Sequence, residues 1–330
     1  MSAPILAELT GSTAMVTGGA GFIGSHLVSS LVRAGAKRVI ALDNLAYSKW
    51  TNLRISENDA VDCVETDLVD LSSDDLVTRL EGCDVLFHFA AEKHNNAVDS
   101  PQRVIDVNVS ATARLFDAAG RAGVRKVVFA SSLYVYGRGG RRPMSETDMA
   151  LPSTIYGVSK LTGEGLLREA ATRDGFGHVC LRLFFVYGPR QFAGTGYPSV
   201  IVRNFLRILR GEEPVIFGDG EQVLDYLHVD DVVGAVLRAA QSQASDEVIN
   251  IGTGRPVSIN LLTETMLRVA QSSLRPKPGP ADWTAGTWRV SNPAKAKELL
   301  GWEPEVGLDE GLRQVWLWMQ ESRKQHWMLS

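Results

Sequence analysis

The first half of the chain alternates short apolar runs with stretches of helical periodicity. The runs lie at 13–17, 38–42, 61–65, 84–90, 126–131 and 178–184, and several are continuous rather than alternating. Continuous apolar runs are typical of strands that are buried on both faces. Amphipathic stretches between them, such as 23–35 and 107–123, end at glycine, which commonly stops a helix. This repetition predicts an α/β fold around a doubly wound parallel sheet.

Beyond about residue 185 the alternation of apolar runs and helical stretches becomes less regular. Residues 200–211 have helical periodicity, and 213–229 predict short strands around an Asp-Gly turn. Residues 230–241 and 246–251 predict a helix and a strand that rejoin the sheet. Residues 275–290 are rich in Pro, Gly and Trp and predict a loop over the functional site.

Length and composition indicate a globular protein of two parts. The 330 residues are 45% hydrophobic, which is usual for a globular chain. We assign 1–182 plus 230–257 to the doubly wound part, and 183–229 plus 258–330 to a smaller α+β part.

Charge and cysteine content restrict the partners. The net charge of −4 comes without a basic block, so we expect no nucleic acid partner. No apolar stretch approaches a membrane span, and the first residues lack the pattern of a signal peptide. Three scattered cysteines predict reduced thiols, and we expect a cytoplasmic protein without membrane contact.

A glycine-rich turn follows the first predicted strand. Gly18, Gly21 and Gly24 stand between the run 13–17 and the helical stretch that follows it. Glycines at this spacing let the backbone approach a pyrophosphate and let the helix pack on the strand, with its N–H groups facing the phosphates. The context of strand, turn and helix therefore predicts a dinucleotide site.

Two aspartates follow the second and third predicted strands. Asp43 lies about 20 residues beyond the glycines, where a carboxylate accepts hydrogen bonds from the adenosine ribose and repels a 2′-phosphate. This position favours NAD over NADP. Asp67 is placed to contact the adenine amino group, and a helix N-cap explains this residue almost equally well.

Tyr156 and Lys160 lie four residues apart at the start of a predicted helix. This spacing places both on one helical face, where an ammonium group is expected to lower the tyrosine pKa and allow general acid–base catalysis. Ser132 ends the preceding predicted strand, at the edge of the sheet where ligands bind. We therefore predict that Ser132 shares the proton of a substrate hydroxyl with Tyr156.

Taken together, these motifs resemble a known family. TGGAGFIG, HFAA at 88–91, SSLYVYG at 131–137, YGVSK, LRLFFVYGPRQ, GDGEQ and DYLHVDDV are similar to those of extended short-chain dehydrogenases/reductases of the sugar-nucleotide epimerase/dehydratase group. The resemblance covers nearly the whole chain. It implies a Rossmann-like fold, NAD as cofactor, a sugar nucleotide as small-molecule substrate, and catalysis by Tyr156, Lys160 and Ser132.

The resemblance also implies two sets of binding residues. The predicted cofactor site comprises Gly18, Gly21, Phe22, Ile23, Gly24, Asp43, Asn44, Ser48, Asp67, Leu68, Phe89, Ala90, Ala91, Lys93, Asn108, Tyr156 and Lys160. The predicted substrate site comprises Glu92, His94, Ser132, Tyr134, Phe185, Arg190, Leu224 and Arg289.

Departures from the family pattern shape the predicted reaction. The 4,6-dehydratases carry Asp-Glu where this chain has Leu133 and Tyr134, which argues against dehydration. Phe185 and Leu224 stand where the family supplies an Asn and an Arg to the substrate. Either other cationic side chains bind the substrate in place of these two polar residues, or the substrate is atypical. The candidate cations are Arg190, Arg203, Arg207, Lys277 and Arg289.

We therefore expect an NAD-dependent isomerase, a 4-epimerase that works through a transient 4-keto sugar. The alternatives are a dehydratase that uses His94, Glu92 or Tyr134, an NAD-dependent dehydrogenase, and a non-catalytic NAD sensor. His88 and His228 are expected to be structural, no metal site is expected, and Trp283 and Trp288 are interpreted as loop packing or stacking residues.

A homodimer is expected through the stretches 98–122 and 155–173, which match helices that pair in the family. The first stretch has apolar residues at helical spacing, a pattern that core burial also explains. These residues are Val104, Val107, Ala111, Leu115 and Ala118.

Overall fold

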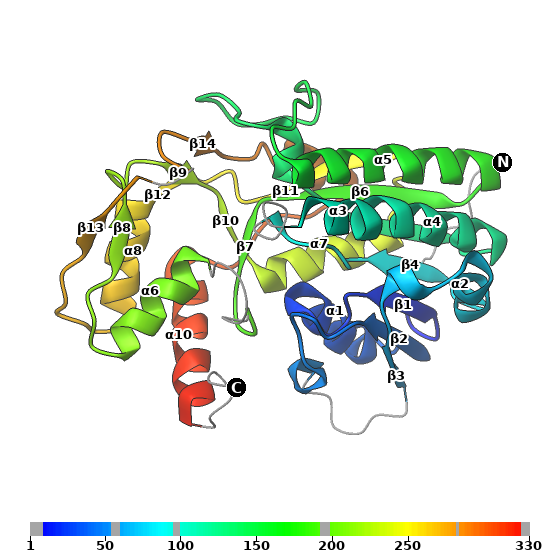
Figure 1. The fold of residues 1–330 in the computed structure, drawn as a ribbon, viewed down its shortest axis with the longest axis horizontal. Helices are drawn as coiled ribbons and strands as arrows, with labels where there is room; N and C mark the ends of the chain where they lie inside the picture. Colours follow the sequence, from blue (N-terminus) through cyan, green and yellow to red (C-terminus); the bar gives the residue numbers. More distant parts are fainter. Residues whose placement is uncertain (1–8, 54–59, 95–99, 192–198, 282–283, 325–330) are drawn as a thin grey trace.

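The computed structural model describes residues 9–53, 60–94, 100–191, 199–281 and 284–324. Its central element is a parallel sheet with strand order β11-β6-β5-β4-β1-β2-β3 (Figure 1). The strands are β1 (Thr13–Thr17), β2 (Arg38–Asp43), β3 (Val61–Glu65), β4 (Val85–His88), β5 (Lys126–Ser132), β6 (Gly177–Leu183) and β11 (Glu247–Ile251). Each of the six predicted runs therefore forms a strand, and the predicted return of 246–251 to the sheet is confirmed by the pairing of β11 with β6.

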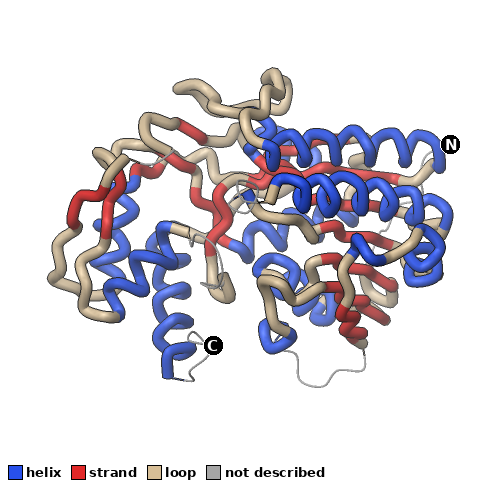
Figure 2. Tube along the Cα trace, in the orientation of Figure 1, coloured by secondary structure: helices blue, strands red, loops and turns tan. Residues whose placement is uncertain are grey.

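Helices cover both faces of this sheet (Figure 2). One hydrophobic cluster joins the sheet to α1 (Phe22–Arg33), α7 (Val229–Gln241) and α9 (Ala294–Leu300). A second cluster joins the other face to α2 (Ser73–Leu80), α4 (Thr112–Arg121) and α5 (Ile155–Asp174). The inner strands are therefore buried on both sides, whereas the edge strand β3 is partly exposed, which confirms the doubly wound fold.

The stretch before α4 differs from a regular helix. α3 (Pro101–Ile105) leads into a π-helical segment, Asp106–Ala111, and only then into α4. Turns of 3-10 helix occur at Trp50–Leu53, Leu68–Asp70 and Leu133–Tyr136. Single π-helical turns are frequent beside functional sites, and this one contains the predicted site residue Asn108.

A third hydrophobic cluster forms a smaller C-terminal lobe, seen beside the sheet in Figure 1. Its helices are α6 (Val200–Leu209), α8 (Ile259–Val269) and α10 (Leu308–Lys324). Its strands are β7 (Phe185–Tyr187), β8 (Val215–Phe217), β9 (Val223–Leu224), β10 (Tyr226–His228), β12 (Val257–Ser258), β13 (Lys277–Gly279) and β14 (Trp288–Arg289).

One expectation for this lobe is confirmed and another is wrong in part. The short strands predicted around the Asp-Gly turn form as β8, which pairs with β13, and β9, which pairs with β12 and β14. Part of the loop predicted at 275–290 forms the strands β13 and β14, because segments distant in sequence supply their partners.

Candidate functional site

A cavity of about 570 Å³ follows the carboxyl ends of β1, β2, β4, β5 and β6 and continues into the C-terminal lobe. Because all strands of the sheet are parallel, the turns that follow them meet at this edge. The cavity brings together residues as distant in sequence as Gly18, Tyr156 and Leu224.

The glycine turn forms one end of the cavity. Gly18 has a φ of +71°, and a Cβ at this position would lie 2.9 Å from the backbone nitrogen of Ala90. A Cβ at Gly24 would lie 1.9 Å from the carbonyl oxygen of Gly18. Gly21 is the N-cap of α1, and no side chain caps the helix. The first N–H groups of α1 are therefore available to a ligand, and this cradle fits a pyrophosphate.

Asp43 ends β2 beside this turn. Its carboxylate accepts hydrogen bonds from the backbone nitrogens of Ala20 (3.0 Å) and Leu45 (2.9 Å) and from Oγ of Ser48 (2.7 Å). These contacts fix the orientation of a carboxylate that lines the cavity. The position fits the predicted contact with a ribose.

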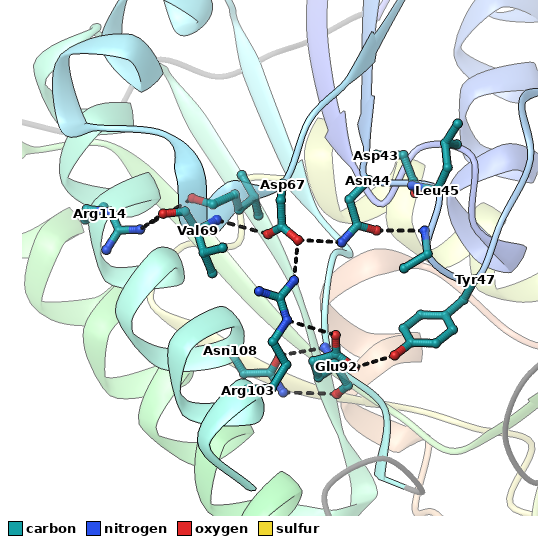
Figure 3. Close-up of polar contacts among 12 residues, drawn as sticks. Asp43, Asn44, Leu45, Tyr47, Asp67, Val69, Glu92, Arg103, Asn108 and Arg114 are labelled. Carbon is teal, nitrogen blue, oxygen red and sulfur yellow. Dashed lines mark hydrogen bonds and ion pairs between the residues drawn. The ribbon is translucent and has the colours of Figure 1, made fainter. Parts of the chain in front are cut away.

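The capping role predicted for Asp67 is confirmed, and its contact with the adenine amino group stays a prediction. It caps the 3-10 turn Leu68–Asp70 by accepting a hydrogen bond from the nitrogen of Val69, and it lines the cavity. Asn44 donates to it at 2.7 Å, and Arg103 forms an ion pair with it (Figure 3). Although burial raises the pKa of Asp67, these hydrogen bonds and the Arg103 charge outweigh it and hold the pKa below its ordinary value.

Arg103, which the sequence did not indicate, joins Asp67 to a second carboxylate. Its Nε donates to Oε1 of Glu92 at 3.4 Å, and the hydroxyl of Tyr47 donates to Oε2 of Glu92 at 3.1 Å (Figure 3). Tyr47, Glu92 and Asp67 line both the main cavity and an adjacent cavity of about 620 Å³. We call these four residues the Arg103 network; it lies between the two cavities.

Most of the predicted cofactor residues line the main cavity. These are Gly18, Gly21, Phe22, Ile23, Gly24, Asp43, Asn44, Ser48, Asp67, Leu68, Phe89, Ala90, Ala91, Lys93, Tyr156 and Lys160. Asn108 is not among the lining residues. It instead exchanges hydrogen bonds with the backbone of Glu92 and donates to Ser159, so it holds the loop that follows β4 (Figure 3).

Ser132, Tyr156 and Lys160 converge on the same cavity. Ser132 ends β5, and Tyr156 stands in the first turn of α5, which Thr154 caps. The side chain of Ser132 is close enough to the Tyr156 hydroxyl to lower its pKa. Nζ of Lys160 lies 5.8 Å from the centroid of the Tyr156 ring and donates to the carbonyl oxygen of Ala130 at 2.8 Å.

The expected lowering of the Tyr156 pKa is wrong for the protein without ligand. Burial raises the pKa of Tyr156 to about 12, against an opposing effect of the hydrogen bond with Ser132. Burial also lowers the pKa of Lys160 to about 7. Both shifts have one cause, because a buried site disfavours the charged form of either group.

Two aromatic rings lie near the ring of Tyr156. The ring centroid of Tyr134 lies 5.6 Å from that of Tyr156 and 4.5 Å from that of His94. Arg289 is buried, and its guanidinium lies 5.3 Å from the ring centroid of Tyr134. Arg289 does not line the cavity itself, so the structure places it behind Tyr134.

The C-terminal lobe contributes mainly apolar lining. The predicted residues Phe185, Arg190 and Leu224 all line the cavity. The sequence did not indicate Phe217, Gln222, Tyr226, Ile259 or Thr284, which line it as well. Of the other candidate cations, Arg203 lines the cavity, whereas Arg207 and Lys277 do not.

The remaining predictions concern single residues. His88 is buried, between Thr17 and Thr112, and His228 is buried and caps α7, so both have the expected structural roles. Trp288 belongs to β14, and Trp283 lies outside the described residues. In the described ranges, no group of three or more His, Cys, Asp or Glu side chains is arranged to hold a metal ion.

Comparisons with known proteins agree with this geometry. The family described as "NAD dependent epimerase/dehydratase family" matches residues 14–252. A UDP-glucose 4-epimerase of Mycolicibacterium smegmatis is 37% identical over 303 residues, 90% of this chain and 95% of the relative.

Solved structures extend the similarity over both parts of the chain. A UDP-N-acetylglucosamine 4-epimerase from Methanobrevibacter ruminantium, in complex with UDP-N-acetylmuramic acid, has a TM-score of 0.90 and 32% identity, with 95% of this chain and 99% of that chain covered. A UDP-glucuronic acid 4-epimerase from Bacillus cereus, in complex with UDP-glucuronic acid and NAD, has a TM-score of 0.85 and 28% identity, with 94% and 99% covered.

Proposed function

Because the chain belongs to the NAD dependent epimerase/dehydratase family, we propose that it interconverts the C4 epimers of a UDP sugar. The predicted family, the Rossmann-like fold, the dependence on NAD and the class of sugar-nucleotide epimerase, an isomerase, are confirmed by the comparisons. The identity of the sugar and the roles of individual residues are our proposals.

The observation that carries the proposal is the convergence of Ser132, Tyr156 and Lys160 on the cavity that continues from the glycine turn. We assign 1–182 plus 230–257 to NAD binding and 183–229 plus 258–330 to substrate binding. The bound sugar then lies where the two parts meet, with its C4 hydroxyl at Tyr156.

NAD, when bound, accepts the hydride from C4 and returns it, and its positive charge favours the phenolate of Tyr156. Tyr156 takes the proton of the C4 hydroxyl while Ser132 shares that hydrogen bond, and the sugar becomes a 4-ketone. Tyr156 would return its proton to the C4 oxygen when the hydride supplied by the bound cofactor adds to the opposite face of C4, which would give the epimer. Lys160 keeps the ring of Tyr156 in an electropositive environment.

The residues that follow Ser132 weigh against the dehydratase alternative. Leu133 and Tyr134 stand where 4,6-dehydratases carry the Asp-Glu pair that expels water, and a leucine side chain cannot transfer a proton. We therefore assign Tyr134 and His94 to substrate contacts rather than to elimination.

We further propose a homodimer formed through the outer faces of α4 and α5. The apolar positions that led to this prediction, Val104, Val107, Ala111, Leu115 and Ala118, are buried within the chain, so core packing accounts for their pattern. Val158 on α5 remains 45% exposed and supports the proposal. A dimeric mass by light scattering, reduced to a monomeric mass in Val158→Asp, is expected.

We also propose a cytoplasmic enzyme that acts without nucleic acid or membrane. Cys63, Cys83 and Cys180 are all unpaired thiols, as in a reducing compartment. Among the described helices, none is long and apolar enough to cross a bilayer.

Proton NMR in D2O tests the proposed function. The purified enzyme with NAD is incubated with UDP-glucose, UDP-glucuronate and UDP-N-acetylglucosamine in turn. A new anomeric signal from the C4 epimer, without deuterium incorporation, is expected for one of them. Deuterium at C5, a new methyl group or net NADH formation would instead support dehydration or plain oxidation.

A further inference from the structure

The part of the cavity in the C-terminal lobe has few charged side chains. Its described lining is dominated by apolar and aromatic side chains such as Phe185, Phe217 and Leu224, and its charged members there are Arg190 and Arg203. A diphosphate is bound by cations and N–H donors, and the planar guanidinium of arginine suits it best. The substrate's diphosphate therefore has two candidate partners in this part of the cavity.

Arg190 is directed toward the cofactor half. Its Nη1 donates to the carbonyl oxygen of Ser25 at 3.1 Å and to Oγ of Ser29 at 3.4 Å, both on α1. These bonds attach the loop that follows β7 to the helix that begins at the glycine turn. The hydrogen bonds of Arg190 therefore hold the two parts of the chain together.

Arg203 is presented by α6 against an aromatic ring. Its guanidinium carbon lies 4.4 Å from the ring centroid of Phe217, in a cation–π contact that fixes the plane of the donor groups. Two buried amides hold Phe217 and α6 in place. Asn204 exchanges two 3.1 Å hydrogen bonds with the backbone of Val215, and Gln222 donates to the carbonyl oxygen of Phe217 at 3.0 Å.

The start of α6 adds to the positive potential. Ser199, the N-cap, and the first helical residues Val200 and Ile201 all line the cavity. The N-terminus of a helix carries partial positive charge that favours an anion nearby. Arg203 stands in the first turns of the same ten-residue helix, so its charge and the helix dipole act on the same region.

We propose that Arg203 binds the diphosphate of the substrate and so determines affinity for a nucleoside diphosphate sugar. The inference rests on the proposed function, since it assigns a partner to part of a UDP sugar. At position 224 the family pattern supplies an Arg to the substrate, and apolar Leu224 on β9 cannot make that contact. We assign the contact to Arg203 instead.

Calorimetric titration of the NAD-loaded enzyme with UDP and with uridine measures how much the diphosphate contributes to binding. We expect Arg203→Met to weaken UDP binding about 10- to 100-fold, because it removes a charge-assisted contact, and to change uridine binding less than twofold. Arg203→Lys keeps the charge and should lose less. Arg210→Met, at the exposed C-terminal end of α6, is the matched control and should bind both ligands like the wild type.

Steady-state kinetics gives a second readout. The KM for the UDP sugar should rise by a similar factor in Arg203→Met while kcat changes much less, as expected for a contact made equally in ground and transition states. Wild-type NAD content and circular dichroism identify variants that are correctly folded. Equal UDP affinity in Arg203→Met and Arg210→Met, with the wild type active, would overturn the assignment and leave the proposed function standing. A wild type that binds no UDP and converts no UDP sugar would overturn both.

Discussion

The hydroxyl of Tyr47 donates a 3.1 Å hydrogen bond to Oε2 of Glu92, which joins the loop after β2 to the loop after β4. Arg103 on α3 contacts the other oxygen of that carboxylate and also Asp67, which follows β3 (Figure 3). The Arg103 network thus connects three loops that line the cofactor end of the cavity. Exchange of NAD is expected to require that these contacts open.

Arg103→Met is therefore expected to speed the release of NAD from the holoenzyme by about tenfold, since loss of a partly buried charge contact acts mainly on dissociation. Release is measured by trapping the dissociated NAD with a coupled dehydrogenase. Arg121→Met removes a surface pair with Asp74 and serves as the control. Equal release rates in the two variants would contradict this role.

Tyr156→Phe is expected to lower kcat by about 10²- to 10⁴-fold, because the phenylalanine cannot exchange a proton with the sugar hydroxyl. The ring remains, so NAD content should stay at the wild-type level. Turnover is followed by chromatographic separation of the two epimers. Near-normal turnover would exclude Tyr156 as the acid–base residue.

Gly24→Ala is expected to cost about 1–3 kcal/mol of stability and to abolish tight NAD binding, because the added methyl would lie 1.9 Å from the carbonyl oxygen of Gly18. Gly234→Ala on α7 is the matched control. Its Cβ would lie 3.8 Å from Trp302, an ordinary contact, so a gain of about 0.5–1 kcal/mol from helix propensity is expected. Denaturant unfolding compares the two. A Gly24 variant as stable as the Gly234 variant would show that this close approach is unimportant.

The lowered pKa of Lys160 predicts that the stability of the protein depends on pH. Its pKa is about 7 in the folded protein, below its ordinary value, so the unfolded chain binds more protons above pH 7. The free energy of unfolding should then rise with pH above 7, whereas below pH 7 the cost of burying the charge is fully present.

Urea unfolding of the NAD-free protein at pH 7 and pH 9 measures this rise. The wild type should gain about 2 kcal/mol more than Lys160→Met over this interval. Lys126, whose pKa burial lowers to about 8, is present in both proteins and cancels in the difference. Parallel pH profiles would mean that Lys160 titrates normally.

The sequence predicted the parts of the site that depend on local geometry. The glycine turn, Asp43 at a strand end, and Tyr156 with Lys160 on one helical face follow from short spacings and from the common edge of parallel strands. Each of these residues lines the cavity. Their backbone positions are set by elements whose periodicity is visible in the chain.

Contacts between distant segments were not predictable in this way. Arg103 lies 36 residues from Asp67 in sequence, and no periodicity indicates that they meet. The composition of residues 275–290, rich in Pro and Gly, predicts a loop. The strands β13 and β14 form there because their partners come from elsewhere in the lobe. The sign of the Tyr156 pKa shift is not visible in the sequence, because burial, its main cause, depends on the whole fold.

The most direct test of the proposed epimerase is conversion of a UDP sugar labelled with deuterium at C4, followed by NMR and mass spectrometry of both epimers in ordinary water. Return of the same hydride predicts that the product keeps the deuterium at C4 with inverted configuration, and that no label appears in solvent. Loss of the label from C4, or product without inversion, would contradict hydride return by bound NAD.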